Sequence, residues 1–246
     1  SNQQGAPLPR LGLDREPTML DPEAREKARV HGEAEAAATR ALNAGSTSAP
    51  TFGTVGDPAE AERCRELVSK ALDRDEKVHT LREALTKLGV ATGNMVHCEH
   101  CPDGLAAAGG YVPSERRVVL CQQWAAKMPT EVSNTLAHEL VHAYDDARAY
   151  LDWSNLTHQA CTEIRAASLS GDCTWGREIN RGNVFLAVSG AGARCIRRRA
   201  ELSVAMNPAC HSESAAARAV QDAWEHCFKD RAPFPQALEN PPTWGR

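Results

Sequence analysis

The chain is organised around the stretch Leu136-Ala137-His138-Glu139-Leu140-Val141-His142-Ala143-Tyr144-Asp145, which contains the pattern His-Glu-x-x-His. On an α-helix, residues four apart lie one turn above each other, with Cβ atoms about 5–6 Å apart. His138 and His142 can therefore reach one Zn²⁺ ion at Zn–N distances of about 2.0–2.1 Å. Glu139 then lies beside the metal, where its carboxylate can take a proton from a water that the metal activates.

The residues around this pattern predict a helix that is buried on most sides. Apolar side chains recur at helical spacing, namely Val132, Leu136, Leu140, Val141 and Tyr144. Histidines and a glutamate placed in such a helix need partners, because an unpaired buried charge is costly. The alternative to a metal site is that the two histidines only cap a core helix and bind no metal. The context favours the metal site.

A catalytic zinc ion takes three protein ligands and one water, so a third ligand must come from elsewhere in the chain. After His142 the sequence predicts a turn at Asp152-Trp153-Ser154-Asn155. A second helix is expected to follow over 156–169. Glu163 on this second helix is our first choice. His158 and Asp145 remain alternatives, each as a ligand or as a partner that orients one. For Arg165 we expect an ordinary structural ion pair, and a contact with a substrate carbonyl or with a carboxylate near the zinc is the weaker alternative.

Composition limits the class of protein. The 246 residues are 42% hydrophobic and 24% charged, which is ordinary for a globular protein, and the net charge of −4 gives no reason to expect a nucleic-acid partner. No apolar run approaches the roughly 18 residues of a transmembrane helix. Nine cysteines favour disulfides in an oxidising compartment, with undetermined pairing and at least one cysteine left over.

Three segments are expected along the chain. Residues 1–56 form an N-terminal extension and linker, residues 57–236 form one domain, and residues 237–246 form a C-terminal tail. The domain should open with one or two helices, because Asp57 is a good N-cap and Gly89 a good terminator. Further helices are expected over 178–187, 191–204 and 212–229. The run Arg197-Arg198-Arg199 is expected to be a solvated face, and a contact with anionic lipid head groups or an acidic partner is the weaker alternative.

A short β section is predicted between these helical regions. Its strands are expected over 95–98, 110–112 and 117–121. The last of them should immediately precede the metal helix, and as an edge strand it could pair with an extended substrate. Cys98-Glu99-His100-Cys101 lacks the second Cys-x-x-Cys of a zinc ribbon, so a disulfide or a structural turn is favoured there. The fold class is therefore α+β, mostly helical with a small β-sheet.

Several motifs together resemble a known family, the zinc metalloproteases of the mitochondrial intermembrane space that process and help assemble a membrane subunit of ATP synthase. The resemblance covers about residues 60–236 and depends on Gly109-Gly110-Tyr111, Val119-Leu120-Cys121-Gln122, His138-Glu139-Leu140-Val141-His142-Ala143-Tyr144-Asp145, Asp152-Trp153, His158-Gln159-Ala160-Cys161-Thr162-Glu163-Ile164-Arg165-Ala166-Ala167, Ser170-Gly171-Asp172-Cys173 and Cys227-Phe228-Lys229-Asp230.

The resemblance implies a zincin-like fold with His138 and His142 as zinc ligands and Glu139 as the catalytic acid and base. It also implies a disulfide-rich protein of the intermembrane space, peripheral to the inner membrane. Its substrate would be the precursor of an ATP synthase membrane subunit, from which it removes the presequence. The alternative is a non-proteolytic assembly factor or resident scaffold in which the metal is structural or vestigial.

Overall fold

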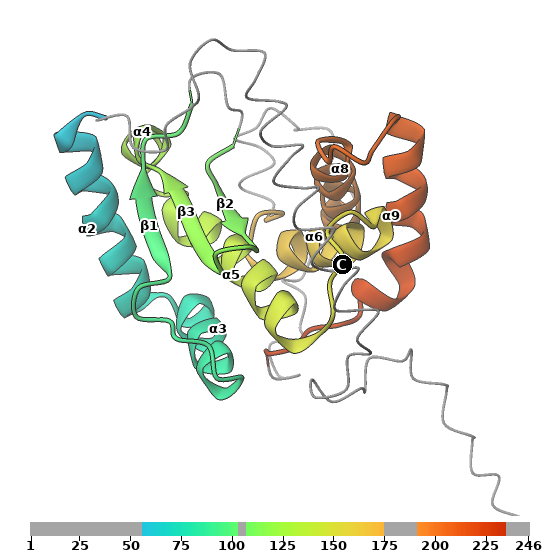
Figure 1. Ribbon diagram of the computed structural model, residues 1–246, viewed down its shortest axis with the longest axis horizontal. Helices are drawn as coiled ribbons and strands as arrows, with labels where there is room; N and C mark the ends of the chain where they lie inside the picture. Colours follow the sequence, from blue (N-terminus) through green and yellow to red (C-terminus); the bar gives the residue numbers. More distant parts are fainter. Residues whose placement is uncertain (1–55, 103–106, 175–190, 235–246) are drawn as a thin grey trace, which may run out of the picture. The chain divides into compact units, whose positions relative to one another are not determined.

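The computed structural model describes residues 56–102, 107–174 and 191–234 (Figure 1). Most of the predicted extension 1–56, the predicted helix 178–187 and the predicted tail 237–246 lie outside the described residues. Within those residues the chain is mostly helical, with one sheet of three strands. The predicted α+β class is confirmed.

The described chain begins with two helices, α2 (Pro58–Arg74) and α3 (Glu76–Lys87). The Asp57 carboxylate accepts a first-turn backbone N–H at 2.9 Å, as its N-cap pattern predicts. Asp75 ends the first helix and caps the second, because its side chain accepts two backbone N–H groups of α3. Gly89 follows α3 with a φ of +81°, a left-handed conformation that glycine adopts without strain.

The sheet has the strand order β1-β3-β2, where β1 is Val96–Glu99, β2 is Gly109–Val112 and β3 is Arg117–Cys121. β1 runs parallel to β3, and β2 runs antiparallel to it. The expectation that β3 is an edge strand is therefore wrong. A short turn returns the chain from β2 onto one side of β3, and β1 occupies the other side. Both β2 and β3 contact the helix that carries His138 and His142.

The expectation that β3 leads directly into the metal helix is wrong. The chain first forms a short helix, α4 (Gln122–Lys127). The metal helix itself is α5 (Val132–Arg148), which packs against α3, β2 and β3. Its middle is buried without a break from Leu136 to Ala143, so the predicted burial on most sides is confirmed.

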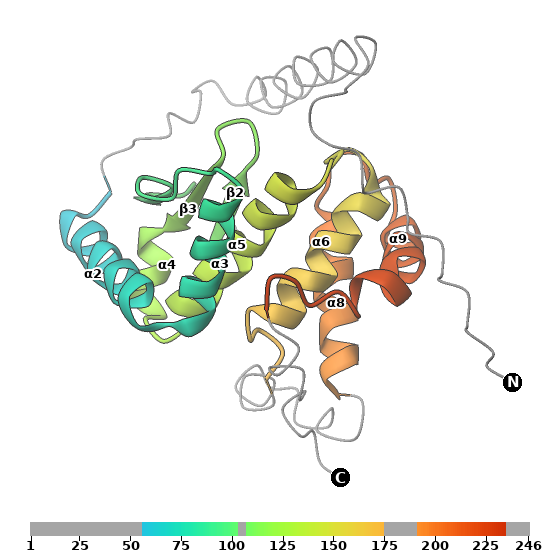
Figure 2. The ribbon, with the colours of Figure 1, turned by 90° about the horizontal axis from the view of Figure 1, so that it is seen from below.

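The C-terminal helices build a second hydrophobic cluster. They are α6 (Leu156–Leu169), α8 (Ala191–Ala205) and α9 (Glu213–Cys227). The first cluster is made by α2, α3, the sheet and α5. α6 lies between α5 on one side and α8 and α9 on the other, and packs on all three (Figures 1 and 2). The interface of α5 with α6 thus joins the two clusters.

Four disulfides pair eight of the nine cysteines, as the composition favours: Cys64 with Cys98, Cys101 with Cys121, Cys161 with Cys227, and Cys173 with Cys195. Cys210 is left over. Cys98 and Cys101 bind different partners, so the Cys-x-x-Cys segment is neither a zinc ribbon nor a single local bridge. The first two disulfides tie the sheet together and to α2, and the last two tie α6 and the segment after it to α9 and α8.

The basic run on α8 is not the solvated face that the sequence suggested. Arg197 and Arg199 are partly buried. The Arg197 guanidinium lies 3.8 Å from the centre of the Trp224 ring, a cation–π contact, and Arg199 pairs with Asp172 at 2.9 Å. Both arginines are thus held by partners from other elements. No helix of the described residues combines the length and the hydropathy needed to cross a bilayer.

Candidate metal centre

Two helices bring three metal-binding side chains together. His138 and His142 come from α5 and Glu163 from α6, and all three are buried. One ligand atom from each residue lies within 4.8 Å of the other two. The Nε2 atoms of His138 and His142 are 3.5 Å and 3.7 Å from the two oxygens of Glu163. The imidazole rings lie one turn apart, with centres 4.9 Å from each other, as the i, i+4 spacing predicts.

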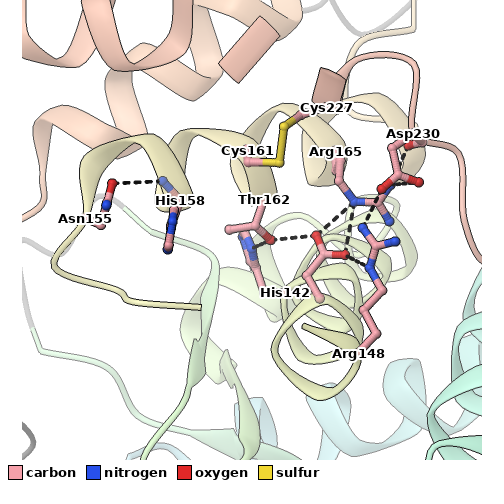
Figure 3. Close-up of a disulfide and its surroundings, with 10 residues drawn as sticks. His142, Arg148, Asn155, His158, Cys161, Thr162, Arg165, Cys227 and Asp230 are labelled. Carbon is pink, nitrogen blue, oxygen red and sulfur yellow. Dashed lines mark hydrogen bonds and ion pairs between the residues drawn. A yellow bond between two sulfur atoms is a disulfide. The ribbon is translucent and has the colours of Figure 1, made fainter. Parts of the chain in front are cut away.

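The orientation of His142 is set by a chain of hydrogen bonds (Figure 3). Its Nδ1 is 2.9 Å from the Thr162 hydroxyl, which itself donates to Asp145 at 2.9 Å. Since the single hydroxyl proton is used in that second bond, the hydroxyl accepts the Nδ1–H of His142. The Nε2 atom, which faces Glu163, is then left with its lone pair. Burial lowers the pKa of His142 to about 4, so the ring is neutral at pH 7, as a metal ligand must be.

His138 is held by a carboxylate. Its Nδ1 lies 3.1 Å from Asp172, which also accepts from Arg199 at 2.9 Å. An ionised carboxylate can only accept, so Nδ1 donates and Nε2 again faces Glu163. Burial lowers the pKa of His138, but the hydrogen bonds to Asp172 and Glu163 outweigh it and hold that pKa well above its ordinary value. The carboxylates around the ring therefore favour a positive charge at Nε2, which a bound cation supplies in place of the proton.

Glu163 and Glu139 have opposite electrostatic surroundings. Burial raises the pKa of Glu163, but both histidines and a hydrogen bond from Ser203 outweigh this effect. The pKa is therefore below its ordinary value, and the carboxyl is ionised at neutral pH. Burial raises the pKa of Glu139 to about 7, and the charge of Glu163 adds to this effect. A backbone hydrogen bond from Tyr111 of β2 reaches the Glu139 carboxylate. Glu139 can therefore exchange a proton near neutral pH.

These residues fit a zinc ion in both geometry and charge. Ligand atoms at about 2.0–2.1 Å from a tetrahedral zinc ion are about 3.4 Å apart. The Nε2 atom of His138 is 3.5 Å from one Glu163 oxygen, and that of His142 is 3.7 Å from the other, so each spacing is close to this value. Two imidazoles and one carboxylate form a known ligand set of catalytic zinc. Glu139 and Asp172 add two further buried carboxyl groups beside this cluster, so the surroundings favour a cation.

The alternative ligands are not part of the cluster. His158 accepts the backbone N–H of Asp152 at 3.2 Å through its Nδ1 and lies outside the one metal-binding group found among the described residues. Asp145 accepts from the Thr162 hydroxyl and pairs with Arg148 and Arg165. It therefore helps to orient His142 through Thr162 and is not one of the three clustered metal-binding residues.

Arg165 forms the structural ion pair that the sequence favoured. Its side chain is fully buried and binds Asp145 at 3.0 Å and Asp230 at 2.7 Å (Figure 3). The guanidinium has no exposed surface, so it is not available to a substrate carbonyl, and the carboxylate that it binds near the proposed metal ligands is Asp145.

Three partners were missed by the sequence reasoning: Thr162, Asp172 and Ser203. Asp172 and Thr162 occur inside the motifs of the family resemblance, but nothing in their spacing assigns them to a histidine. Ser203 lies on α8, and no local pattern connects it with Glu163.

Comparison with known proteins gives one consistent result. Residues 62–235 match the model of the peptidase M76 family. Proteins named mitochondrial inner membrane protease ATP23 are similar in sequence. That of Malassezia globosa is 45% identical over 54% of this chain and 55% of its own length. That of Yarrowia lipolytica is 37% identical over 72% of this chain and 69% of its own length. That of Schizosaccharomyces pombe is 35% identical over 71% of this chain and 92% of its own length. No solved structure matches the chain significantly.

Proposed function

Because the chain belongs to the peptidase M76 family, we propose that it is a zinc-dependent endopeptidase with its active centre between α5 and α6. His138, His142 and Glu163 are the proposed metal ligands, and Glu139 is the proposed general base. The observation that supports this most directly is the convergence of three buried donor atoms within 4.8 Å of one another. Glu139 adjoins the first ligand in the chain, and its pKa of about 7 suits proton transfer at neutral pH.

Each residue of the proposed centre has a separate role in the reaction. A zinc ion bound here would polarise the scissile carbonyl and lower the pKa of a water molecule. His138 and His142 bind through Nε2, and Asp172 and Thr162 keep their rings in place through Nδ1. The Glu139 carboxylate takes up the proton of the attacking water and returns it to the leaving amine.

β2 is the element that we propose binds the peptide. It is an edge strand of the described sheet, it packs against α5, and its Tyr111 backbone N–H already reaches Glu139. An extended peptide that pairs with a free strand edge gains main-chain hydrogen bonds whatever its sequence. β2 takes the role that the sequence reasoning assigned to β3.

For the substrate we propose the precursor of an ATP synthase membrane subunit, cleaved at its presequence, as the sequence resemblance implies. The similar proteins are named as mitochondrial inner membrane proteases. We propose the intermembrane space for this chain, peripheral to the inner membrane, and a second role in assembly of ATP synthase.

The test is a comparison of the protein with Glu139→Gln, which keeps the size of the side chain and removes its basicity. The variant should bind zinc normally and lose cleavage of the precursor by about 10²–10⁴-fold. Glu83→Gln, at an exposed position on α3, is the matched control. Full cleavage by the zinc-loaded Glu139→Gln protein would refute the mechanism. Restoration of ATP synthase assembly by this variant, without cleavage, would favour the assembly-factor alternative.

A further inference from the structure

Two aromatic side chains lie beside the metal centre and share one partner. The Tyr111 hydroxyl donates to one oxygen of Asp146 at 2.8 Å, and the Trp153 indole N–H donates to the other at 3.2 Å. The centre of the Trp153 ring is 6.0 Å from the Tyr111 ring and 6.0 Å from the ring of His142. The two aromatic rings come from β2 and from the loop before α6, and Asp146 belongs to α5.

Tyr111 is held on α5 at two points. Its backbone N–H bonds to Glu139 and its hydroxyl bonds to Asp146, two helical turns further along the same face of α5. Burial raises the pKa of Tyr111, and the charge of Asp146 raises it further. The phenol therefore keeps its proton and donates throughout the neutral pH range. Asp146 thus fixes the strand that approaches the catalytic carboxylate.

Trp153 is held from the other side as well. Its backbone carbonyl accepts from the Asn207 amide at 2.8 Å, and the same amide donates to Gln159 at 2.6 Å. With its N–H bound to Asp146, the indole has no polar group left to offer, although the residue is only partly buried. Next to a ligand of the metal centre, this side chain presents an apolar surface.

We propose that Asp146 is a positioning residue that holds Tyr111 and Trp153 together as an aromatic wall. This wall selects peptides with an apolar side chain next to the scissile bond, an inference that rests on the peptidase activity proposed above. A peptide whose carbonyl reaches the metal ligands comes close to Trp153, because the centre of its ring lies 6.0 Å from that of His142. Each oxygen of Asp146 accepts from one of the two rings, so this carboxylate fixes both of them, and Trp153 offers the peptide aromatic surface.

Binding without turnover tests the wall separately from catalysis. The full zinc-loaded chain is used in the Glu139→Gln background, and calorimetry measures the Kd of two decapeptides that differ only in Phe or Ala beside the central bond. The Phe peptide should bind about tenfold more tightly, or more. Asp146→Ala and Trp153→Ala should reduce this ratio to about threefold or less, whereas Trp153→Phe, which keeps an aromatic ring, should retain most of it. Asp222→Ala, exposed on α9, is the matched control.

The outcomes separate the wall from the catalytic proposal. A Phe preference that survives Asp146→Ala, or that is absent before any change in the wall, overturns the inference. So does an equal loss of binding for both peptides together with a loss of zinc, because Asp146 would then only support the fold. A Phe preference that depends on Asp146, found in a protein that cleaves nothing when Glu139 is present, supports the wall and overturns the peptidase proposal.

Discussion

The contact between His138 and Asp172 leads to a quantitative expectation for zinc affinity. Asp172→Asn keeps the shape of the side chain but removes the charge that accepts from His138 at 3.1 Å and from Arg199 at 2.9 Å. Loss of a carboxylate that orients a ligating histidine weakens metal binding about 10–100-fold. That range corresponds to about 1.4–2.7 kcal/mol of binding free energy.

The assay is a competition for Zn²⁺ between the metal-free protein and a chromophoric chelator, at one pH and without reductant so that the disulfides stay closed. Asp222→Asn, exposed on α9, should change the affinity by less than about twofold. Thr162→Val removes a neutral hydrogen bond from His142, which contributes about 1 kcal/mol, and should weaken binding about fivefold. A hydrogen bond to a carboxylate is about twice as strong as a neutral one, so Asp172→Asn should have the larger effect.

The same titration decides the third ligand. Glu163→Ala should weaken zinc binding more than about 100-fold, beyond the effect of any orienting residue. His158→Ala should leave the affinity nearly unchanged, because that ring binds the loop before α6. The reasoning is refuted if Asp172→Asn binds zinc within twofold of the unmodified protein, or if His158→Ala weakens binding more than Glu163→Ala does.

Three further predictions concern stability, measured as the free energy of unfolding in urea. Asp145→Asn should cost about 3 kcal/mol, because the fully buried Arg165 then keeps only one carboxylate partner. Replacement of both Cys161 and Cys227 by Ser should cost about 4 kcal/mol, since this disulfide closes a loop with a sequence separation of 66. Asp75→Ala should cost about 1–2 kcal/mol at pH 7 through the lost N-cap. Burial raises the pKa of Asp75, but its hydrogen bonds and a neighbouring lysine lower it below its ordinary value, so this cost should shrink as the pH falls below about 4.

Each of these predictions has a distinct way to fail. An Asp145→Asn protein with a free energy of unfolding within 1 kcal/mol of the original would show that Arg165 does not depend on this partner. For the cysteine pair, the unmodified protein under full reduction is the control and should lose at least as much stability. Asp73→Ala, exposed at the end of α2, controls for Asp75. A cost for Asp75→Ala that grows below pH 4 contradicts the sign derived from the lowered pKa.

Local patterns were sufficient for the parts of this protein that depend on neighbouring residues. The spacing of His138 and His142 places both rings on one face of α5, because the helical repeat decides it before any other element packs. The caps at Asp57 and Gly89 and the bounds of α6 followed from the same short-range rules. Composition indicated disulfides, but pairing depends on which cysteines the fold brings together.

Long-range packing decided the remainder. β3 became the central strand because β1 and β2 closed on its two sides, and no residue of the strand itself encodes that order. Asp172 and Thr162 reach the histidines only once α5 and α6 are packed. Glu163 and His158 show the limit most directly. At about 100° per residue they point about 140° apart around α6, so only one of them can face α5. The sequence determined that only one of Glu163 and His158 could be the third ligand. Which of the two faces α5 depends on the rotation of α6, and the packing of α6 on α5, α8 and α9 sets that rotation.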